Sequence, residues 1–191
     1  MATNRRLIAA DGPEFYPTPA WGTQALLDHV RFYGPIYEPC CGDGAMSEVL
    51  IAAGYNVVSS DIVDRGYGHV ADFLDKPGQF ENVVTNPPFN VAAELLEHAL
   101  QLTTGKVCFL LRTAFLESSS RYYQFFRSEP PDTVLIFSER LSMFPAGHSA
   151  TTGGTTSYSW FIWDMEKQFG KTEIYWIPPG LKPNSRAVRT L

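Results

Sequence analysis

The sequence lacks any long apolar segment. None of its 191 residues belongs to a run approaching the roughly 20 apolar residues that a membrane-spanning helix needs. The first fifteen residues, MATNRRLIAADGPEF, are too polar for a secretory signal peptide. We therefore expect a soluble cytoplasmic protein with no membrane partner.

Cysteine is also scarce. The chain has three, of which Cys40 and Cys41 are adjacent and Cys108 lies in an apolar run, and no C-x-x-C spacing typical of a metal site occurs. The pattern predicts free thiols in a reducing compartment and indicates no metal site.

Basic residues are fewer than acidic ones. The chain has 15 Lys and Arg against 20 Asp and Glu, a net charge of −5. This is the wrong sign for holding duplex DNA by neutralising many phosphates, but local patches matter more than the total, so nucleic acid is not excluded. The end of the chain, GLKPNSRAVRTL, carries Lys182, Arg186 and Arg189 and no acid. It is either a basic contact or a disordered end.

Strand-like and helix-like segments alternate along most of the chain, which favours one α/β domain with a mostly parallel sheet. Two late strands follow each other without a helix, which suggests an antiparallel hairpin at one edge. The expected domain spans 15–180, between a flexible N-terminal segment, 1–14, and a basic tail, 181–191. Strands are expected at 36–38, 56–62, 69–73, 82–85, 106–115, 133–140, 157–165 and 173–177, and helices at 19–32 (capped by Thr18), 45–53, 91–102 and 118–129.

The stretch EPCCGDGAMSEVLIAAGYNVVSSDI reads as a strand, a glycine turn, a helix and a second strand that ends in Asp61. Glycines such as Gly42 and Gly44 let a ligand approach the backbone closely. An acid at the end of the second strand can accept hydrogen bonds from both hydroxyls of a ribose. Ser47 stands where a dinucleotide motif has its third glycine, so a nucleoside cofactor without a pyrophosphate fits better. A plain helix start capped by Asp43 is the alternative.

The stretch TNPPFN, residues 85 to 90, follows an apolar strand. Each proline holds the residue before it in an extended conformation and contributes no N–H. The side-chain oxygen of Asn86 and the carbonyl of Pro87 can therefore converge on the two N–H groups of one amino group, with Phe89 stacked on its ring. Pro-Pro ending a strand is the alternative, but Asn-Pro-Pro-Phe arises by chance in this length with a probability of roughly one in a thousand.

Three motifs together resemble a known family. NPPF resembles the [DNS]-P-P-[YF] motif of S-adenosylmethionine-dependent amino-methyltransferases, and EPCCGDG resembles their cofactor motif. FYPTP, residues 15–19, resembles the N-terminal motif of the adenine-specific DNA branch. Their order is the γ-type order of N6-adenine DNA methyltransferases, and the likeness covers 15 to about 165. It implies a Rossmann-like, mostly parallel sheet of seven strands with an antiparallel last hairpin and helices on both faces.

The resemblance also implies S-adenosylmethionine as cofactor and DNA as substrate. In such a site the protein would contact the methionine part, the amino group, the ribose and the adenine of the cofactor, and it would also hold the target base. The resemblance implies that the catalytic residues, which hold the target base, are Asn86, Pro87, Pro88 and Phe89. It implies that the cofactor-binding residues are Tyr16, Thr18, Pro19, Glu38, Pro39, Cys40, Gly42, Gly44, Asp61, Ile62, Asp72 and Phe73.

The chain departs from this family in having no sizeable target-recognition region. The resemblance then implies a minimal enzyme with relaxed sequence preference, a single-stranded substrate, or a protein partner that supplies recognition. The Gly- and Ser-rich loop at 141–157, with Arg140, Phe144 and His148, is the candidate for substrate contact, an exposed hairpin loop being the alternative. A basic rim of Arg112, Arg121 and Arg127 is a further candidate, and Trp160, Phe161 and Trp163 are expected to pack in the core or on an edge strand.

Other functions remain open at this point. The same chemistry would serve an amino-methyltransferase acting on RNA or on a protein glutamine amide. Glutamine methyltransferases typically place a helical domain before the glycine turn, whereas this chain has only about 35 residues there. A catalytically silent methyltransferase-like binding subunit is the third reading.

Overall fold

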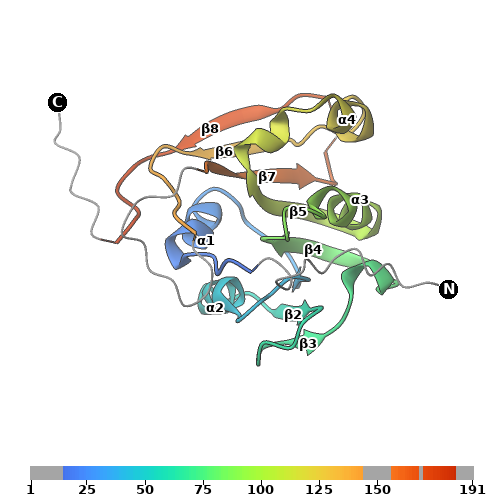
Figure 1. Ribbon diagram of the computed structural model, residues 1–191, viewed down its shortest axis with the longest axis vertical. Coiled ribbons are helices and arrows are strands. Elements are labelled where there is room, and N and C mark those ends of the chain that lie inside the picture. Colours follow the sequence, from blue (N-terminus) through green and yellow to red (C-terminus); the bar gives the residue numbers. More distant parts are fainter. Residues whose placement is uncertain (1–14, 144–155, 168–169, 184–191) are drawn as a thin grey trace.

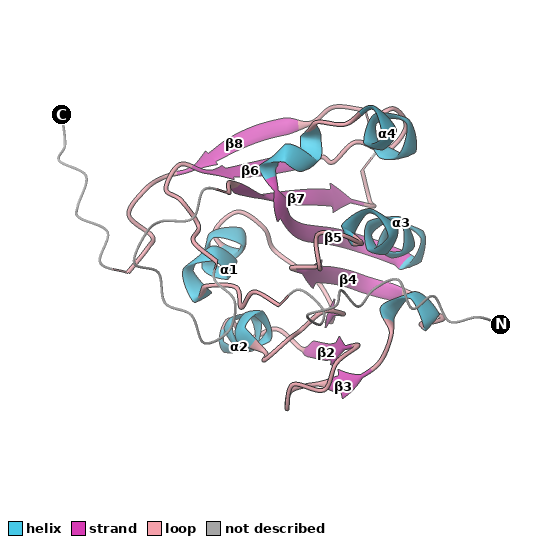
Figure 2. Cartoon of the chain, viewed as in Figure 1, coloured by secondary structure: helices cyan, strands magenta, loops and turns pink. Residues whose placement is uncertain are grey.

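The computed structural model describes residues 15–143, 156–167 and 170–183, which build one eight-stranded sheet with helices on both faces (Figure 1, Figure 2). The strand order is β3-β2-β1-β4-β5-β7-β6-β8. The strands are β1 (Ile36–Glu38), β2 (Val57–Asp61), β3 (His69–Val70), β4 (Phe80–Thr85), β5 (Thr103–Arg112), β6 (Thr133–Phe137), β7 (Tyr158–Asp164) and β8 (Glu173–Ile177).

All neighbouring strands are parallel except those that pair with β7, which runs antiparallel to both β5 and β6. The expected mostly parallel sheet with an antiparallel hairpin is therefore confirmed. The sheet has the eight strands that the segments of the sequence predicted, including β8, which pairs in parallel with β6; this is one more than the seven that the family resemblance implied. In the antiparallel hairpin of β6 and β7, the second strand, β7, is the inner one and lies between β5 and β6.

Alternate side chains of the central strands point to opposite faces of the sheet, and helices pack on both faces. Cys108 and Leu110 of β5 pack with α1 (Ala20–Leu27) and α2 (Ala45–Ala52). Their neighbours Val107, Phe109 and Leu111 pack on the opposite face with α3 (Ala92–Leu102). Because successive side chains of a strand point to opposite faces, a strand buried on both sides reads as a continuous apolar run.

The three aromatic residues expected to pack are fully buried in β7. Trp160 donates its indole N–H to the carbonyl of Gly22 at 2.8 Å, and Trp163 donates to the carbonyl of Glu129 at 3.0 Å. Phe161 lies on the same face as Trp163, in the cluster under α3. A buried indole needs such an acceptor, so these contacts tie β7 to the start of α1 and to the segment before β6.

The first and fourth expected helices differ from their predictions. The first ends at Leu27 instead of Phe32, and Gly34, with φ 74°, then turns the chain into β1. The hydroxyl of Thr18 does not cap it, because it accepts a hydrogen bond from Asn86 instead. The segment expected as a helix at 118–129 is one α-turn, α4 (Ser119–Arg121), followed by a π-helical turn, Tyr122–Phe126. Ser118 caps it by accepting from the N–H of Arg121 at 3.4 Å.

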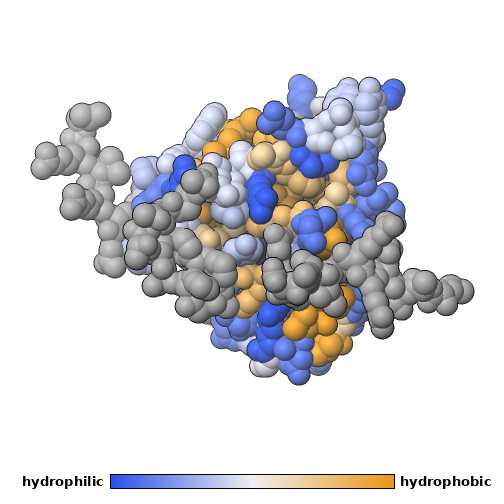
Figure 3. Space-filling view, viewed as in Figure 1, coloured by the Kyte–Doolittle hydropathy of each residue, from blue (hydrophilic) through white to orange (hydrophobic). Residues whose placement is uncertain are grey.

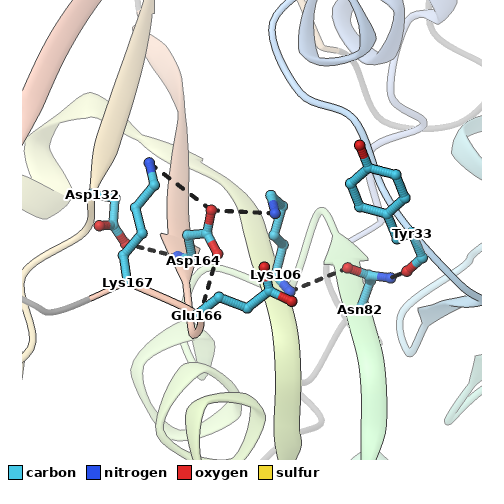
Figure 4. A network of polar contacts seen from close by, with 7 residues as sticks. All are labelled: Tyr33, Asn82, Lys106, Asp132, Asp164, Glu166 and Lys167. Atoms are coloured by element: carbon cyan, nitrogen blue, oxygen red, sulfur yellow. Dashed lines mark hydrogen bonds and ion pairs between the residues drawn. The ribbon is translucent and has the colours of Figure 1, made fainter.

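Polar contacts fasten the amino-terminal edge of the parallel strands (Figure 4). Asn82 donates to the carbonyls of Tyr33 and Pro35 at 2.7 and 3.1 Å and accepts from the N–H of Lys106 at 3.1 Å. Lys106 forms an ion pair with Asp164 at 3.2 Å, and the N–H of Asp164 donates to Asp132 at 2.7 Å. These contacts connect the strands at their amino-terminal ends. The predicted site lies at the opposite, carboxyl-terminal ends of the parallel strands.

Exposed apolar side chains mark the two outer strands. On the face shown in Figure 3, apolar residues are visible over β8 and beside β2 and β3. Ile174 of β8 and Val70 of β3 are among them. No helix of the described segments is long and apolar enough to cross a bilayer.

Candidate functional site

A pocket opens at the carboxyl ends of β1, β2, β3 and β4. Of the predicted residues, Pro19 leads into α1, and Gly42 and Gly44 lie in the turn behind the pocket wall. The remaining predicted cofactor and base residues line the pocket itself: Tyr16, Thr18, Glu38, Pro39, Cys40, Asp61, Ile62, Asp72, Phe73, Asn86, Pro87, Pro88 and Phe89. Residues from four separate parts of the chain thus meet at the edge where parallel sheets bind ligands.

The glycine turn is closed by aromatic rings of the protein. Gly42 has φ 56° and Gly44 has φ 87°. A Cβ atom would lie 2.1 Å from the Phe15 ring at Gly42 and 2.5 Å from the Tyr67 ring at Gly44. Both positions therefore need glycine for two reasons, the left-handed backbone and the ring packed against it. The sequence analysis expected a different reason, the close approach of a ligand, whereas the two Cβ positions face rings of the protein itself.

Asp61 joins the glycine turn to the end of β2. One carboxylate oxygen accepts from the N–H of Gly42 and the other from the N–H of Val63, both at 2.9 Å. A carboxylate oxygen has two acceptor sites, so each can still accept one hydrogen bond from a ligand. This is the arrangement that two ribose hydroxyls require.

Glu38 is a buried carboxyl at the end of β1, with 2% of its surface exposed. Burial raises the pKa of Glu38 to about 8, and the hydroxyl of Ser47, which donates to it, offsets part of that rise. Ser47 in turn contacts the hydroxyl of Ser59 at 2.6 Å. The residue that replaces the third glycine of a dinucleotide motif is thus the hydrogen-bond donor to Glu38. A cationic ligand group beside Glu38 would favour its ionised form.

The next part of the pocket comes from β2 and the turn after β3. Ile62 is 42% exposed at the pocket rim. Asp72 caps a 3-10 turn, Phe73–Asp75, by accepting from the N–H of Leu74 at 3.0 Å. Phe73 is buried and packs its ring against Tyr37 and the ring of His98. It therefore supports the pocket from the core as well as lining it.

Asn86 follows β4 and is held by the FYPTP segment. Its amide nitrogen donates to the carbonyl of Tyr16 and to the hydroxyl of Thr18, both at 3.1 Å, and lies 3.6 Å from the sulfur of Met143. A carbonyl can only accept, so this contact fixes which end of the amide is NH₂. The amide oxygen is buried and has no hydrogen-bond partner among the described residues. Buried acceptors are normally paired, so among the described residues this oxygen is left available to accept from a ligand that enters the pocket.

Phe89 lies in an aromatic cluster, which we define as Tyr16, Phe89 and Tyr158. The ring centroid of Phe89 is 6.4 Å from that of Tyr16 and 5.6 Å from that of Tyr158. The guanidinium carbon of Arg112 lies 4.7 Å from the Phe89 centroid. Tyr158 was missed by sequence reasoning, because only the pairing of β5 with β7 places it opposite Arg112.

The three arginines proposed as a basic rim do not act together. Arg112 lies on Phe89, whereas Arg121 lies 4.6 Å from the Phe115 centroid and donates to the carbonyls of Ala114, Phe115 and Glu117. Arg127 is exposed after the π-helical turn. Arg121 therefore has a structural role, and Arg112 is the one that contacts a pocket residue, Phe89.

The ends of the 141–157 loop lie beside the site. Arg140 is exposed after β6, and Met143 reaches Asn86. At the other end, Ser157 accepts from the N–H of Thr113, next to Arg112. Phe144 and His148 lie outside the described residues, as do 1–14 and most of the tail.

Two further residues of the wall, Phe15 and Arg65, had no role assigned from the sequence. Arg65 lies with its guanidinium carbon 4.3 Å from the centroid of the Phe15 ring, and both line the pocket. Phe15 belongs to FYPTP but had no assigned role. Phe15 packs against Gly42 and Arg65 lies over Phe15, so together they cover the glycine turn.

The cysteines are poor candidates for nucleophiles. All three are free thiols. Burial raises the pKa of Cys40 and Cys108, and it raises the pKa of Cys41 to about 12. The thiols therefore stay protonated at neutral pH. Among the described residues, no group of three or more His, Cys, Asp or Glu is placed to bind a metal ion.

Comparison with known proteins finds likeness in structure alone. No family model and no curated protein matches the sequence. A protein of Vibrio vulnificus YJ016 assigned as the modification subunit of a type I restriction enzyme matches with a TM-score of 0.61 at 13% identity, over 93% of this chain and 49% of that one. The M protein of the type I restriction enzyme EcoKI matches at 0.53 and 12%, over 77% and 43%.

A third match has a similar length to this chain. It is a protein of Pyrococcus horikoshii assigned as an RNA methyltransferase, with a TM-score of 0.55 and 12% identity over 76% of this chain and 80% of that one. The chain spans about half the length of the Vibrio protein. These likenesses establish a Rossmann-like methyltransferase fold.

Proposed function

We propose that the protein transfers a methyl group from S-adenosylmethionine to the exocyclic amino group of adenine in DNA. The observation that carries this proposal is the amide of Asn86. Its nitrogen is held by Tyr16 and Thr18, and its buried oxygen has no partner in the part of the chain that the structure describes. Two prolines that offer carbonyls only lie next to it.

This arrangement suits an amine nucleophile. The lone pair of an exocyclic amine is delocalised into the ring, so the amine attacks poorly. The oxygen of Asn86 and the carbonyl of Pro87 accept its two N–H groups and favour a pyramidal nitrogen with the lone pair directed away from them. No basic side chain is needed, because the nitrogen becomes acidic only as it is alkylated and then loses its proton to solvent. Positioning of this kind contributes several kcal/mol.

The pocket residues fit S-adenosylmethionine. The cofactor supplies, when bound, an electrophilic methyl group on a sulfonium sulfur. The buried carboxyl of Glu38 suits its ammonium group, and the two remaining acceptor sites of Asp61 suit its ribose hydroxyls. Ile62 offers an exposed apolar surface for the adenine, and Asp72 keeps one carboxylate oxygen beyond its contact with Leu74.

Adenine in DNA is favoured over other amino groups by two features. The FYPTP segment is the element that orients Asn86, and it is the motif that resembles the adenine-specific DNA branch. Two structural neighbours with TM-scores above 0.5 are assigned to type I restriction enzymes, which supports a DNA substrate and a protein partner. The neighbour assigned to RNA keeps RNA as the second candidate.

The test uses S-adenosylmethionine with a tritiated methyl group. The protein is incubated separately with single-stranded DNA, duplex DNA, RNA and a protein lysate, and the products are hydrolysed to nucleosides or amino acids. We expect label in N6-methyladenine from DNA, and the strand form that carries it shows which substrate is used. Label confined to RNA or protein would contradict the DNA assignment, and no label despite cofactor binding would favour a silent subunit.

A further inference from the structure

Arg112 lies at the carboxyl end of β5, beside Phe89 and Tyr158 of the aromatic cluster. Its guanidinium carbon is 4.7 Å from the Phe89 centroid. In the sheet Arg112 pairs directly with Tyr158, whose ring is 5.6 Å from that of Phe89. The cation therefore lies against the ring that the proposed function assigns to the target base.

We propose that Arg112 binds a backbone phosphate of the substrate, leaving the Phe89 ring when the target base stacks there. This proposal rests on the proposed function, since it uses Phe89 as the stacking surface for the base. It adds that the protein recognises a phosphate-bearing polynucleotide at this site.

The exchange is energetically reasonable. A cation over an exposed aromatic ring contributes about 0.5–1 kcal/mol, and a base stacked on an aromatic side chain contributes about 1–3 kcal/mol. The guanidinium loses the interaction energy with the ring, and a charge-assisted, bidentate hydrogen bond to a phosphate offsets that loss. Arg112 is exposed and also interacts with the side chain of Tyr158, so its turn toward a phosphate in solvent exchanges both contacts and needs no unfolding of β5.

Charge around the site gives Arg112 particular weight. The whole chain carries −5, and the pocket itself is lined by Glu38, Asp43, Asp61 and Asp72. Arg65 is the one cation among the described pocket residues, and it stacks on Phe15 on the cofactor side. A polyanion approaching this acidic surface therefore needs a cation on the base side, and Arg112 is placed there.

The same contact discriminates among substrate classes. A glutamine amide in a protein or a free nucleoside brings an amino group but no backbone phosphate, so neither would gain from Arg112. A polynucleotide gains one contact for each bound target. Loss of Arg112 should therefore weaken a polynucleotide selectively.

The first test measures binding of a fluorescently labelled single-stranded oligonucleotide at several salt concentrations. The variants are Arg112→Ala, Arg112→Lys and, as a matched control, Arg127→Ala, which removes an exposed arginine away from the pocket. We expect Arg112→Ala to weaken binding about tenfold and to lower the slope of log K against log salt by about 0.7. Arg112→Lys should keep the slope because it keeps the charge, and Arg127→Ala should match the wild type.

The second test compares methyl transfer to the oligonucleotide and to adenosine. Arg112→Ala should raise the KM for the oligonucleotide about tenfold and leave adenosine and the Kd of S-adenosylmethionine unchanged. An unchanged salt slope, equal loss on both substrates, or a wild type that binds no oligonucleotide overturns the proposal. Wild-type binding without any methyl transfer would contradict the proposed function instead, and the salt slope of Arg112→Ala would still decide the role of Arg112.

Discussion

At the scale of single residues, the orientation of Asn86 depends on a hydroxyl that the sequence suggested for another purpose. Thr18 was expected to cap a helix, and the structure has it accept from the amide of Asn86 at 3.1 Å. A residue next to a proline at a helix start is ambiguous in sequence, because capping and tertiary contacts use the same hydroxyl. The link between residues 18 and 86 needs the folded chain.

Replacing Thr18 by valine should loosen the amide of Asn86 without changing the shape of the side chain. We expect Thr18→Val to lower kcat about tenfold, since roughly 1–1.5 kcal/mol of positioning is lost. Thr23→Val is the matched control, because the Thr23 hydroxyl is also buried but has no hydrogen-bond partner among the described residues. Steady-state kinetics in which both variants match the wild type would contradict this role of Thr18.

The raised pKa of Glu38 should make stability depend on pH. A carboxyl whose pKa is about 8 in the folded chain and about 4.5 when unfolded contributes stability fully below pH 4.5 and loses it as pH rises to 8. We expect urea unfolding to show a free energy that falls by a few kcal/mol across this window. Glu38→Gln stays neutral, so it should remove the slope due to this group. A slope that is the same in both proteins would contradict it.

Gly42 tests the fit of Phe15 over the glycine turn. A methyl group at Gly42 would collide with the Phe15 ring at 2.1 Å, whereas one at Gly54 would meet nothing within 4 Å. Both glycines have positive φ, at 56° and 91°, so both alanine variants carry the backbone penalty of about 1 kcal/mol. We expect only Gly42→Ala to weaken cofactor binding, by more than about tenfold in isothermal titration. Equal cofactor affinity in the two variants would exclude a role for this packing.

At the scale of elements, apolar runs correctly predicted the central strands. The ends of the strands and the type of helix in aromatic segments were predicted less well. The run at 106–115 is a strand, but it begins at Thr103 and ends at Arg112, where a 3-10 turn, Thr113–Leu116, takes over. In the segment 118–129 the N–H of Arg127 bonds to the carbonyl of Tyr122, which widens the helix into a π-turn. Hydrophobic period alone does not separate an α-turn from a π-turn.

The amino-terminal edge of the sheet should matter for stability and not for chemistry. Asn82 is 2% exposed and makes three hydrogen bonds there, to Tyr33, Pro35 and Lys106. Asn82→Ala leaves these buried groups unpaired, so we expect a loss of about 2–3 kcal/mol in unfolding free energy with kcat unchanged below the melting temperature. Lys167→Ala, at an exposed ion pair with Asp164, should cost less than about 0.5 kcal/mol. Lost kcat in folded Asn82→Ala would contradict this division.

At the scale of the whole molecule, the sequence predicted the class of fold but not its strand order. Alternating segments indicated a parallel sheet, and the hairpin at its end was expected. β7 enters between β5 and β6, and β8 completes the sheet beside β6; both placements are tertiary pairings that the pattern of a single segment does not encode. Three short motifs named the main pocket residues. The glycine turn and NPPF each follow a parallel strand at the same end of the sheet, whereas FYPTP meets them only in the folded chain. Arg65, which lines the pocket, and Tyr158, which packs on Phe89, were identified only by the structure.

The proposed methyl transfer depends on the amide oxygen of Asn86, so single-turnover methyl transfer by Asn86→Ala tests it most directly. The matched control is Asn90→Ala, which removes an exposed amide from the same loop. We predict that Asn86→Ala binds S-adenosylmethionine within about twofold of the wild type and transfers methyl at least about a hundredfold more slowly, as expected for loss of a positioned hydrogen-bonding group. Asn90→Ala should match the wild type. An Asn86→Ala protein that transfers methyl at the wild-type rate would contradict the account.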